Sequence, residues 1–189
     1  MPSRSRTLLL VTVALALSAL LAVAQDRTPP DRATLEQAMR DGNWKIAYDG
    51  YRALAHDPAT DPALVGNDLQ AAVQAIYNLG NQADFDALVE KAIEVHAANP
   101  RLLWSAAQCY FNAQNGYGSI VAGKFERGQH RGGTARFVYS MDRDRVRALQ
   151  LMHEARTKFP ADFDRPTLAQ FHIEFANMLL QNRRGDGAD

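Results

Sequence analysis

The sequence predicts an all-α protein in which helix-turn-helix repeats stack into a superhelix that one glycine-rich insertion interrupts. Three observations carry this prediction. Apolar residues recur with the helical period of about 3.6 residues in six segments. Proline, glycine and capping residues separate these segments where helices would start and stop. Strand-like alternation extends nowhere beyond a few positions, so no sheet is expected.

Each of the six segments places its apolar residues on one side of a helix. In chain order these stripes are Trp44, Ala47, Tyr48, Tyr51, Leu54; Leu69, Ala72, Val73, Ile76, Leu79; Phe85, Leu88, Val89, Ala92, Ile93; Leu103, Ala106, Ala107, Tyr110, Phe111; Val146, Leu149, Met152, Ala155, Phe159; and Leu168, Phe171, Phe175, Met178, Leu179. Because an apolar face must be covered by a neighbour, we expect consecutive helices to pack in pairs.

The residues between the stripes are typical of helix ends. The predicted N-caps are Asp61 before Pro62, Asn99 before Pro100, Ser140 and Asp164. Gly42 and Gly80 stand where two neighbouring helices would be joined by a tight turn. The chain is therefore expected to alternate between helix, turn and helix.

Residues 31–182 resemble the tetratricopeptide repeat, a helix-turn-helix unit of about 34 residues. The positions that match the family's packing motif are Ala148, Met152 and Ala155 before Pro160, and Trp104, Ala107 and Phe111 after Pro100. The prolines are spaced more widely than in the family, so an interrupted array is expected. The resemblance implies a curved stack whose first helices line a concave groove.

The first 24 residues read as a secretory signal peptide. Arg4 and Arg6 precede an apolar run that ends in Ala22-Val23-Ala24, a small-residue pattern that a signal peptidase accepts. Cleavage near Ala24, ahead of a linker over 25–30, would export the protein to the periplasm or the extracellular space, with no membrane attachment afterwards. The alternative is an uncleaved membrane anchor.

Composition argues against several functional classes. The 189 residues carry 21 Lys and Arg against 21 Asp and Glu, which disfavours a nucleic-acid partner. The single cysteine, Cys109, excludes an internal disulfide and any multi-cysteine metal site, and its apolar surroundings predict a core residue. No histidine pair has metal-ligand spacing and no catalytic motif is complete. We therefore predict a non-enzymatic protein without metal or cofactor.

The insertion, at about residues 113–140, is rich in glycine and carries a basic cluster. The candidate binding residues here are Lys124, Arg127, His130 and Arg131, close to Arg136. They are suited to carboxylate or phosphate ligands, and could equally pair with acids on adjacent helices or belong to a solvated loop. Gly118 to Lys124 match a phosphate loop, but Phe125 replaces the required Ser or Thr, so nucleotide binding is not expected.

Amide side chains recur at helical spacing on the polar faces of three segments. They are Gln70, Gln74 and Asn78; Gln108 and Asn112; and Gln170 and Asn177, with Glu174 between them. Because an amide offers both a donor and an acceptor, these faces could bind an extended peptide backbone. The alternative is an ordinary solvated helix face.

Residues 120–133 and 142–152 resemble the N-terminal helical region of large exported bacterial alpha-2-macroglobulin-like proteins. The resemblance implies membership of a longer protease-trapping polypeptide, with residues 183–189 as a flexible tail and possible truncation point. The family's thioester motif is absent from this chain. The resemblance therefore implies that the chain belongs to such a polypeptide, and it does not imply inhibitory chemistry.

Three functional hypotheses follow. The leading one is an exported, non-catalytic scaffold that binds a protein or peptide, which can be a later domain of its own chain. The second is an exported hydrolase-like enzyme that uses the basic loop and Glu174. The third is a purely structural helical domain.

Overall fold

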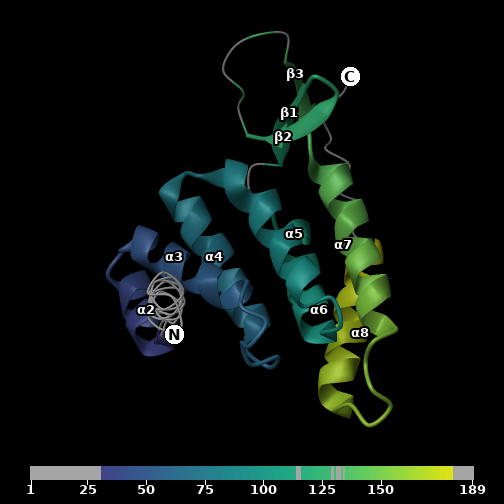
Figure 1. Ribbon diagram of the computed structural model, residues 1–189. Coiled ribbons are helices and arrows are strands. Elements are labelled where there is room, and N and C mark those ends of the chain that lie inside the picture. Colours follow the sequence, from purple (N-terminus) through teal and green to yellow (C-terminus); the bar gives the residue numbers. More distant parts are fainter. Residues whose placement is uncertain (1–30, 114–115, 129, 131–132, 134, 181–189) are drawn as a thin grey trace, which may run out of the picture. The chain divides into compact units, whose positions relative to one another are not determined.

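The computed structural model describes residues 31–180 apart from 114–115, 129, 131–132 and 134. The described residues form seven α-helices, one 3-10 turn and a small three-stranded sheet (Figure 1). The helices are α2 (Arg32–Arg40), α3 (Trp44–Ala55), α4 (Val65–Leu79), α5 (Phe85–Val95), α6 (Pro100–Phe111), α7 (Met141–Arg156) and α8 (Arg165–Leu180), and the 3-10 turn is η1 (Gln82–Asp84). The predicted signal peptide, linker and tail lie outside the described residues.

Most helices pack against the helix that precedes or follows them in the chain, as predicted. The most extensive packing joins α3 to α4 and α6 to α7, and α4 also packs against α6. One continuous core runs through these contacts, and its largest fully buried side chains include Phe85, Leu69, Tyr110 and Phe171. The predicted helical fold class is therefore confirmed at the level of helix content and packing.

Most of the predicted helix ends are present. Asn99 accepts hydrogen bonds from the backbone N–H groups of residues 101 and 102, and Asp164 accepts one from Thr167. Gly42 and Gly80 have positive φ values of 74° and 69°, the left-handed conformation that favours glycine. The α2–α3 turn and the end of α4 therefore lie where the sequence places them.

Two predicted N-caps need correction. Helix α4 begins at Val65 and not at Pro62, because Asp61 caps a separate turn through the N–H of Ala63. Ser140 occupies the N-cap position of α7 but its hydroxyl makes no capping bond. It donates to the Asp144 carboxylate instead, at 2.8 Å.

The insertion contains a sheet, which corrects the expectation that no strand is present. Strands β1 (Tyr117–Val121), β2 (Lys124–Arg127) and β3 (Arg136–Tyr139) form an antiparallel sheet in the order β2-β1-β3. Ala122 and Gly123, both at positive φ, make the two-residue hairpin turn between β1 and β2. Gly118 is required where β1 passes β2, because a Cβ there would lie 2.4 Å from the Phe125 ring.

Most residues of the two sequence stripes nearest the C-terminus are buried or partly buried as predicted, and Met152, Ala155, Phe171 and Met178 lie in the core. Val146 and Leu179 were expected in the core, but each is more than half exposed. Besides Met152 and Ala155, the buried face of α7 includes Ala148, Leu151 and Asp144, which the predicted stripe did not contain. An apolar pattern does not indicate that Asp144 belongs to this face, which explains why the pattern included Val146 instead.

Candidate functional site

A groove of about 410 Å³ lies between α4 and α6. Its lining residues are Gln70, Val73, Gln74, Tyr77, Gln108, Cys109 and Asn112. Four of these are the amides that the sequence predicts on the polar faces of these two segments. The helical spacing of four residues within each pair places the amides on facing walls, because α4 and α6 pack side by side.

A hydrogen-bonded chain of amides runs across three helices at one side of this groove. Gln70 Nε2 donates to Gln108 Oε1 at 2.6 Å, and Gln108 Nε2 donates to Glu174 Oε2 at 2.6 Å. The chain therefore links α4, α6 and α8 through side chains that lie 38 and 66 residues apart in the sequence. The structure thus brings together candidate residues from all three predicted polar faces.

Glu174 is the point at which this chain ends. The indole N–H of Trp104 also donates to Glu174 Oε2 at 2.8 Å, and Gln170 Nε2 donates to Oε1 at 2.9 Å. Both carboxylate oxygens are engaged by neutral donors from α6 and α8. This arrangement fixes the orientation of Gln108 and gives Glu174 a positioning role beside the groove.

Two groove amides keep their hydrogen-bonding capacity. Among the described residues, the side-chain amides of Gln74 and Asn112 have no hydrogen-bond partner, and both side chains are exposed. They lie one helical turn beyond Gln70 and Gln108, on α4 and α6 respectively. The side chain of Asn78 donates to the backbone carbonyl of Gln74 at 2.9 Å. Asn177 is exposed on α8. Gln74 and Asn112 are therefore the groups of the groove best placed to bond a ligand.

Cys109 contributes to the floor of the groove without being reactive. Its side chain is buried, as predicted, and it is a free thiol. Burial raises the pKa of the thiol to about 12. The nucleophilic thiolate is thus not populated at neutral pH.

Arg127, predicted as a ligand-binding residue, lies instead in a buried ionic cluster, which corrects that prediction. Its guanidinium donates to Asp144 at 2.7 and 2.9 Å and to Asp86 at 2.9 and 3.2 Å. It also lies 4.5 Å from the ring centroid of Phe85. The side chains of Arg127 and Asp144 are 0% and 3% exposed. The cluster holds the sheet against α5 and α7.

The ionic cluster continues toward α6 through a second pair. Arg147 forms a two-pronged bond to Glu90, with distances of 2.6 and 2.8 Å. The hydroxyl of Tyr110 donates to Glu90 at 2.8 Å, and Arg143 contacts Asp86 at 2.9 Å. Arg127, Arg143 and Arg147 thus pair with acids of α5, which is the alternative that the sequence left open.

The other basic candidates do not converge on one site. Lys124 is exposed on β2, and His130 lies 2.9 Å from Glu126 on the same hairpin. Arg131 lies outside the described residues. The segment that resembles a phosphate loop forms β1, its hairpin turn and the start of β2, so its backbone pairs within the sheet. A phosphate loop requires these N–H groups to face the ligand.

The carboxylates of the ionic cluster make the free energy of unfolding depend on pH. Burial raises the pKa of Asp86, but hydrogen bonds from Arg127 and Arg143 outweigh it, and the pKa lies below its ordinary 3.8. The pKa of Glu90 likewise lies below 4.5 because the bonds from Arg147 and Tyr110 outweigh burial. Both depressed values contribute stability that is present above about pH 4.5 and is lost as the pH falls through the folded-state values.

Urea unfolding between about pH 6 and pH 3 measures this effect. The chain is expected to lose stability steeply below about pH 4.5, and the Asp86→Asn/Glu90→Gln variant is expected to lose less over that interval. Asp162→Asn, at an exposed position, serves as the control. An equally steep decline in the double variant would show that other groups govern the acid transition.

Searches against protein families, curated proteins and solved structures found no match for the chain. Within the described part of the chain, no cluster of three or more His, Cys, Asp or Glu side chains could hold a metal ion. None of the helices that the structure describes has the length and apolar character needed to cross a membrane.

Proposed function

We propose that the chain is an exported, non-catalytic, tetratricopeptide-like interaction module that binds an extended peptide in the groove between α4 and α6. This proposal rests on Gln74 and Asn112, whose side-chain amides have no hydrogen-bond partner in the described part of the chain and lie on facing walls of the groove. Val73 and Cys109 also line this groove. An extended peptide presents alternating donors and acceptors, which amides complement without needing a fixed charge.

The arrangement of the first helices supports the repeat interpretation. In a stack of helix pairs, the first helices of successive pairs line one surface. The bonds from Gln70 to Gln108 and from Gln108 to Glu174 join α4, α6 and α8, which are the first helices of successive predicted pairs. The same bonds hold the groove walls in place before a ligand arrives, which lowers the entropic cost of binding.

The partner proposed for this groove is a protein segment in extended form. If the chain belongs to a macroglobulin-like protease-trapping polypeptide, as the resemblance of residues 120–133 implies, a later segment of that polypeptide is one source. A separate exported protein is the other. In both cases the groove recognises the main chain through amides and accepts modest apolar side chains beside Val73 and Tyr77.

A peptide selection tests this proposal. The full chain is used to select from a displayed library of random linear peptides, and a fluorescein-labelled selected peptide is titrated by fluorescence anisotropy. The Gln74→Ala/Asn112→Ala variant is expected to bind about tenfold or more weakly, since each lost hydrogen bond contributes about 0.5–1.5 kcal/mol. Both side chains are exposed, so the fold should be retained.

Asn67→Ala is the matched control, because Asn67 is an exposed amide of α4 that does not line the groove. It is expected to leave the affinity unchanged. Selection of no sequence above background, or a selected peptide that binds the double variant as tightly as the original chain, would contradict the proposal.

A further inference from the structure

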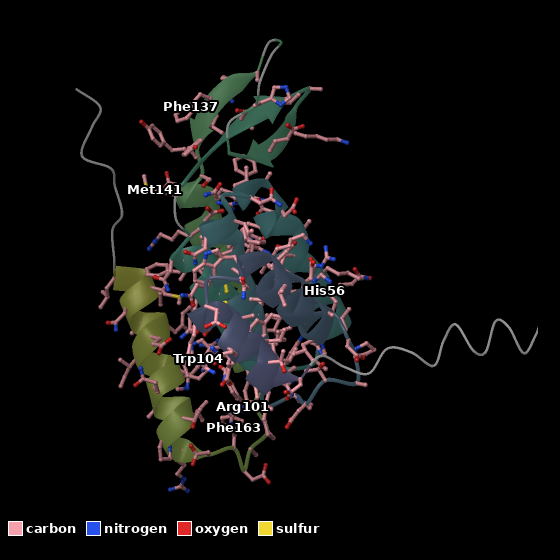
Figure 2. The ribbon with its side chains drawn as sticks, turned by 90° about the vertical axis from the view of Figure 1, so that its left-hand side faces the viewer. His56, Arg101, Trp104, Phe137, Met141 and Phe163 are labelled. Atoms are coloured by element: carbon pink, nitrogen blue, oxygen red, sulfur yellow. The ribbon has the colours of Figure 1, made fainter. Side chains whose placement is uncertain are left out.

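Helix α8 has apolar residues on two opposite faces. Its inner face buries Phe171 and Met178 against the core. Its outer face carries Ala169, Ile173, Ala176 and Leu180, all exposed, with Ile173 at 56% and Leu180 at 80%. We call these four residues the outer stripe. Figure 2 shows α8 at the edge of the described helices, with Trp104 of α6 on its inner side.

The outer face of α8 also lacks charge. From Pro166 to Leu180 the only Asp, Glu, Lys or Arg is Glu174, which is bonded on the inner side to Trp104 and Gln108. The exposed faces of α2, α3 and α5 carry ion pairs, such as Lys91 with Glu94 on α5. A helix that is apolar on both sides is typical of one that is covered on both sides.

The spacing of the outer stripe identifies what can cover it. Its residues follow one another at intervals of four, three and four, which is the seam of a helix pair. Large and small residues alternate along it. If two copies of α8 pair antiparallel about a two-fold axis between positions 173 and 176, each large residue faces an alanine. Ile173 then meets Ala176 of the second copy, and Leu180 meets its Ala169.

This alternation fits the antiparallel arrangement and no parallel one in register. Alternating bulky and small residues across facing positions fills a helix interface evenly. A parallel pair would set Ile173 against Ile173 and Ala176 against Ala176, which leaves crowded layers next to empty ones. The positions that flank the antiparallel seam are Gln170 opposite Asn177 and His172 opposite Leu179, so no like charges of Asp, Glu, Lys or Arg face each other.

We propose that the chain forms a two-fold symmetric homodimer through antiparallel pairing of the outer stripes of two α8 helices. The interface is isologous, because the same four residues serve both copies. It lies on the face of α8 opposite Phe171 and leaves the groove amides Gln74 and Asn112 free. The proposal is therefore independent of what the groove binds.

Sedimentation velocity of the full chain over a wide concentration range tests the dimer. A reversible monomer–dimer equilibrium is expected, and Ile173→Lys is expected to weaken it at least about tenfold, because the seam would bury an unpaired ammonium group. Ile46→Lys is the matched control, since Ile46 of α3 is similarly exposed at 58%. Thermal unfolding by circular dichroism checks that both variants keep their fold.

A mixing experiment tests the antiparallel register. Ile173→Lys and Ala176→Glu chains, each with a different tag, should associate with each other more tightly than either does with itself, because position 173 faces position 176 of the other copy. A monomeric chain at all concentrations would overturn the proposal. So would association that Ile173→Lys leaves intact, which would locate it elsewhere in the chain, or a mixture that associates no better than its components.

Discussion

Arg127→Ala is expected to lower the free energy of unfolding by about 3–5 kcal/mol, the cost of removing one partner from a buried ion pair. The substitution leaves the carboxylates of Asp86 and Asp144 close together, and the half-exposed Arg143 is the cation of the described residues that still contacts both. It also removes the cation that lies over the Phe85 ring. Equilibrium unfolding in urea, followed by circular dichroism, measures the loss.

A second variant separates the missing charge from the missing volume. In Arg127→Met/Asp144→Leu, both members of the most buried pair become apolar, so a smaller loss than that of Arg127→Ala is expected. Arg136→Ala, at an exposed position of β3, should change stability by no more than about 0.5 kcal/mol. An Arg127→Ala chain as stable as the original would show that the cluster does not hold the sheet to α5 and α7.

Phe171→Ala is expected to cost about 3–5 kcal/mol, as for other fully buried aromatic side chains. Phe171 is 0% exposed, and its ring centroid lies 5.5 Å from that of Trp104 and 4.9 Å from that of Phe159. These contacts attach α8 to α6 and to the segment after α7. In the same region, the Arg101 guanidinium covers the Phe163 ring at 4.7 Å, and the two side chains lie beside each other in Figure 2.

Tryptophan fluorescence gives this variant a local readout once Trp44, the other tryptophan of the chain, is replaced by Phe in both the variant and its reference. Since Trp104 donates to Glu174, loosening of α8 should expose the indole and shift its emission to longer wavelength before the remaining helices unfold. Asn177→Ala, on the exposed side of α8, is the control and should leave both emission and stability unchanged within about 0.5 kcal/mol. A Phe171→Ala chain with unaltered emission would indicate that α8 is held mainly by other contacts.

The helices could be predicted because each has a local signal. Apolar period, the Asn99 cap and the glycines at 42 and 80 all act within one or two turns of the chain. The proximity of the three polar faces was expected from the repeat resemblance, in which the first helices of successive pairs line one surface. The place of Asp144 on the buried face of α7 did not follow, since its partner Arg127 comes from another element.

The sheet could not be predicted because its strands have four or five residues and little apolar pattern. The turn at Gly123 and the flanking Tyr117, Ser119 and Val121 were the available signal. This signal is weak, because the same segment contains six glycines and a glycine-rich segment is equally typical of a loop. The role of Arg127 depends on residues 41 positions before and 17 after it, a separation that no local pattern encodes.

The long sequence separations in the ionic cluster have a consequence for the route by which the chain reaches its native state. Contacts between distant segments incur loop-closure entropy before they contribute energy, so they form late. Helices α3 and α4 can associate early through local contacts, whereas Asp86 receives Arg127 and Arg143 only after the hairpin has formed and α7 has docked. The bonds from Arg127 to Asp86 and Asp144 should therefore form late in folding, after the α3–α4 contacts.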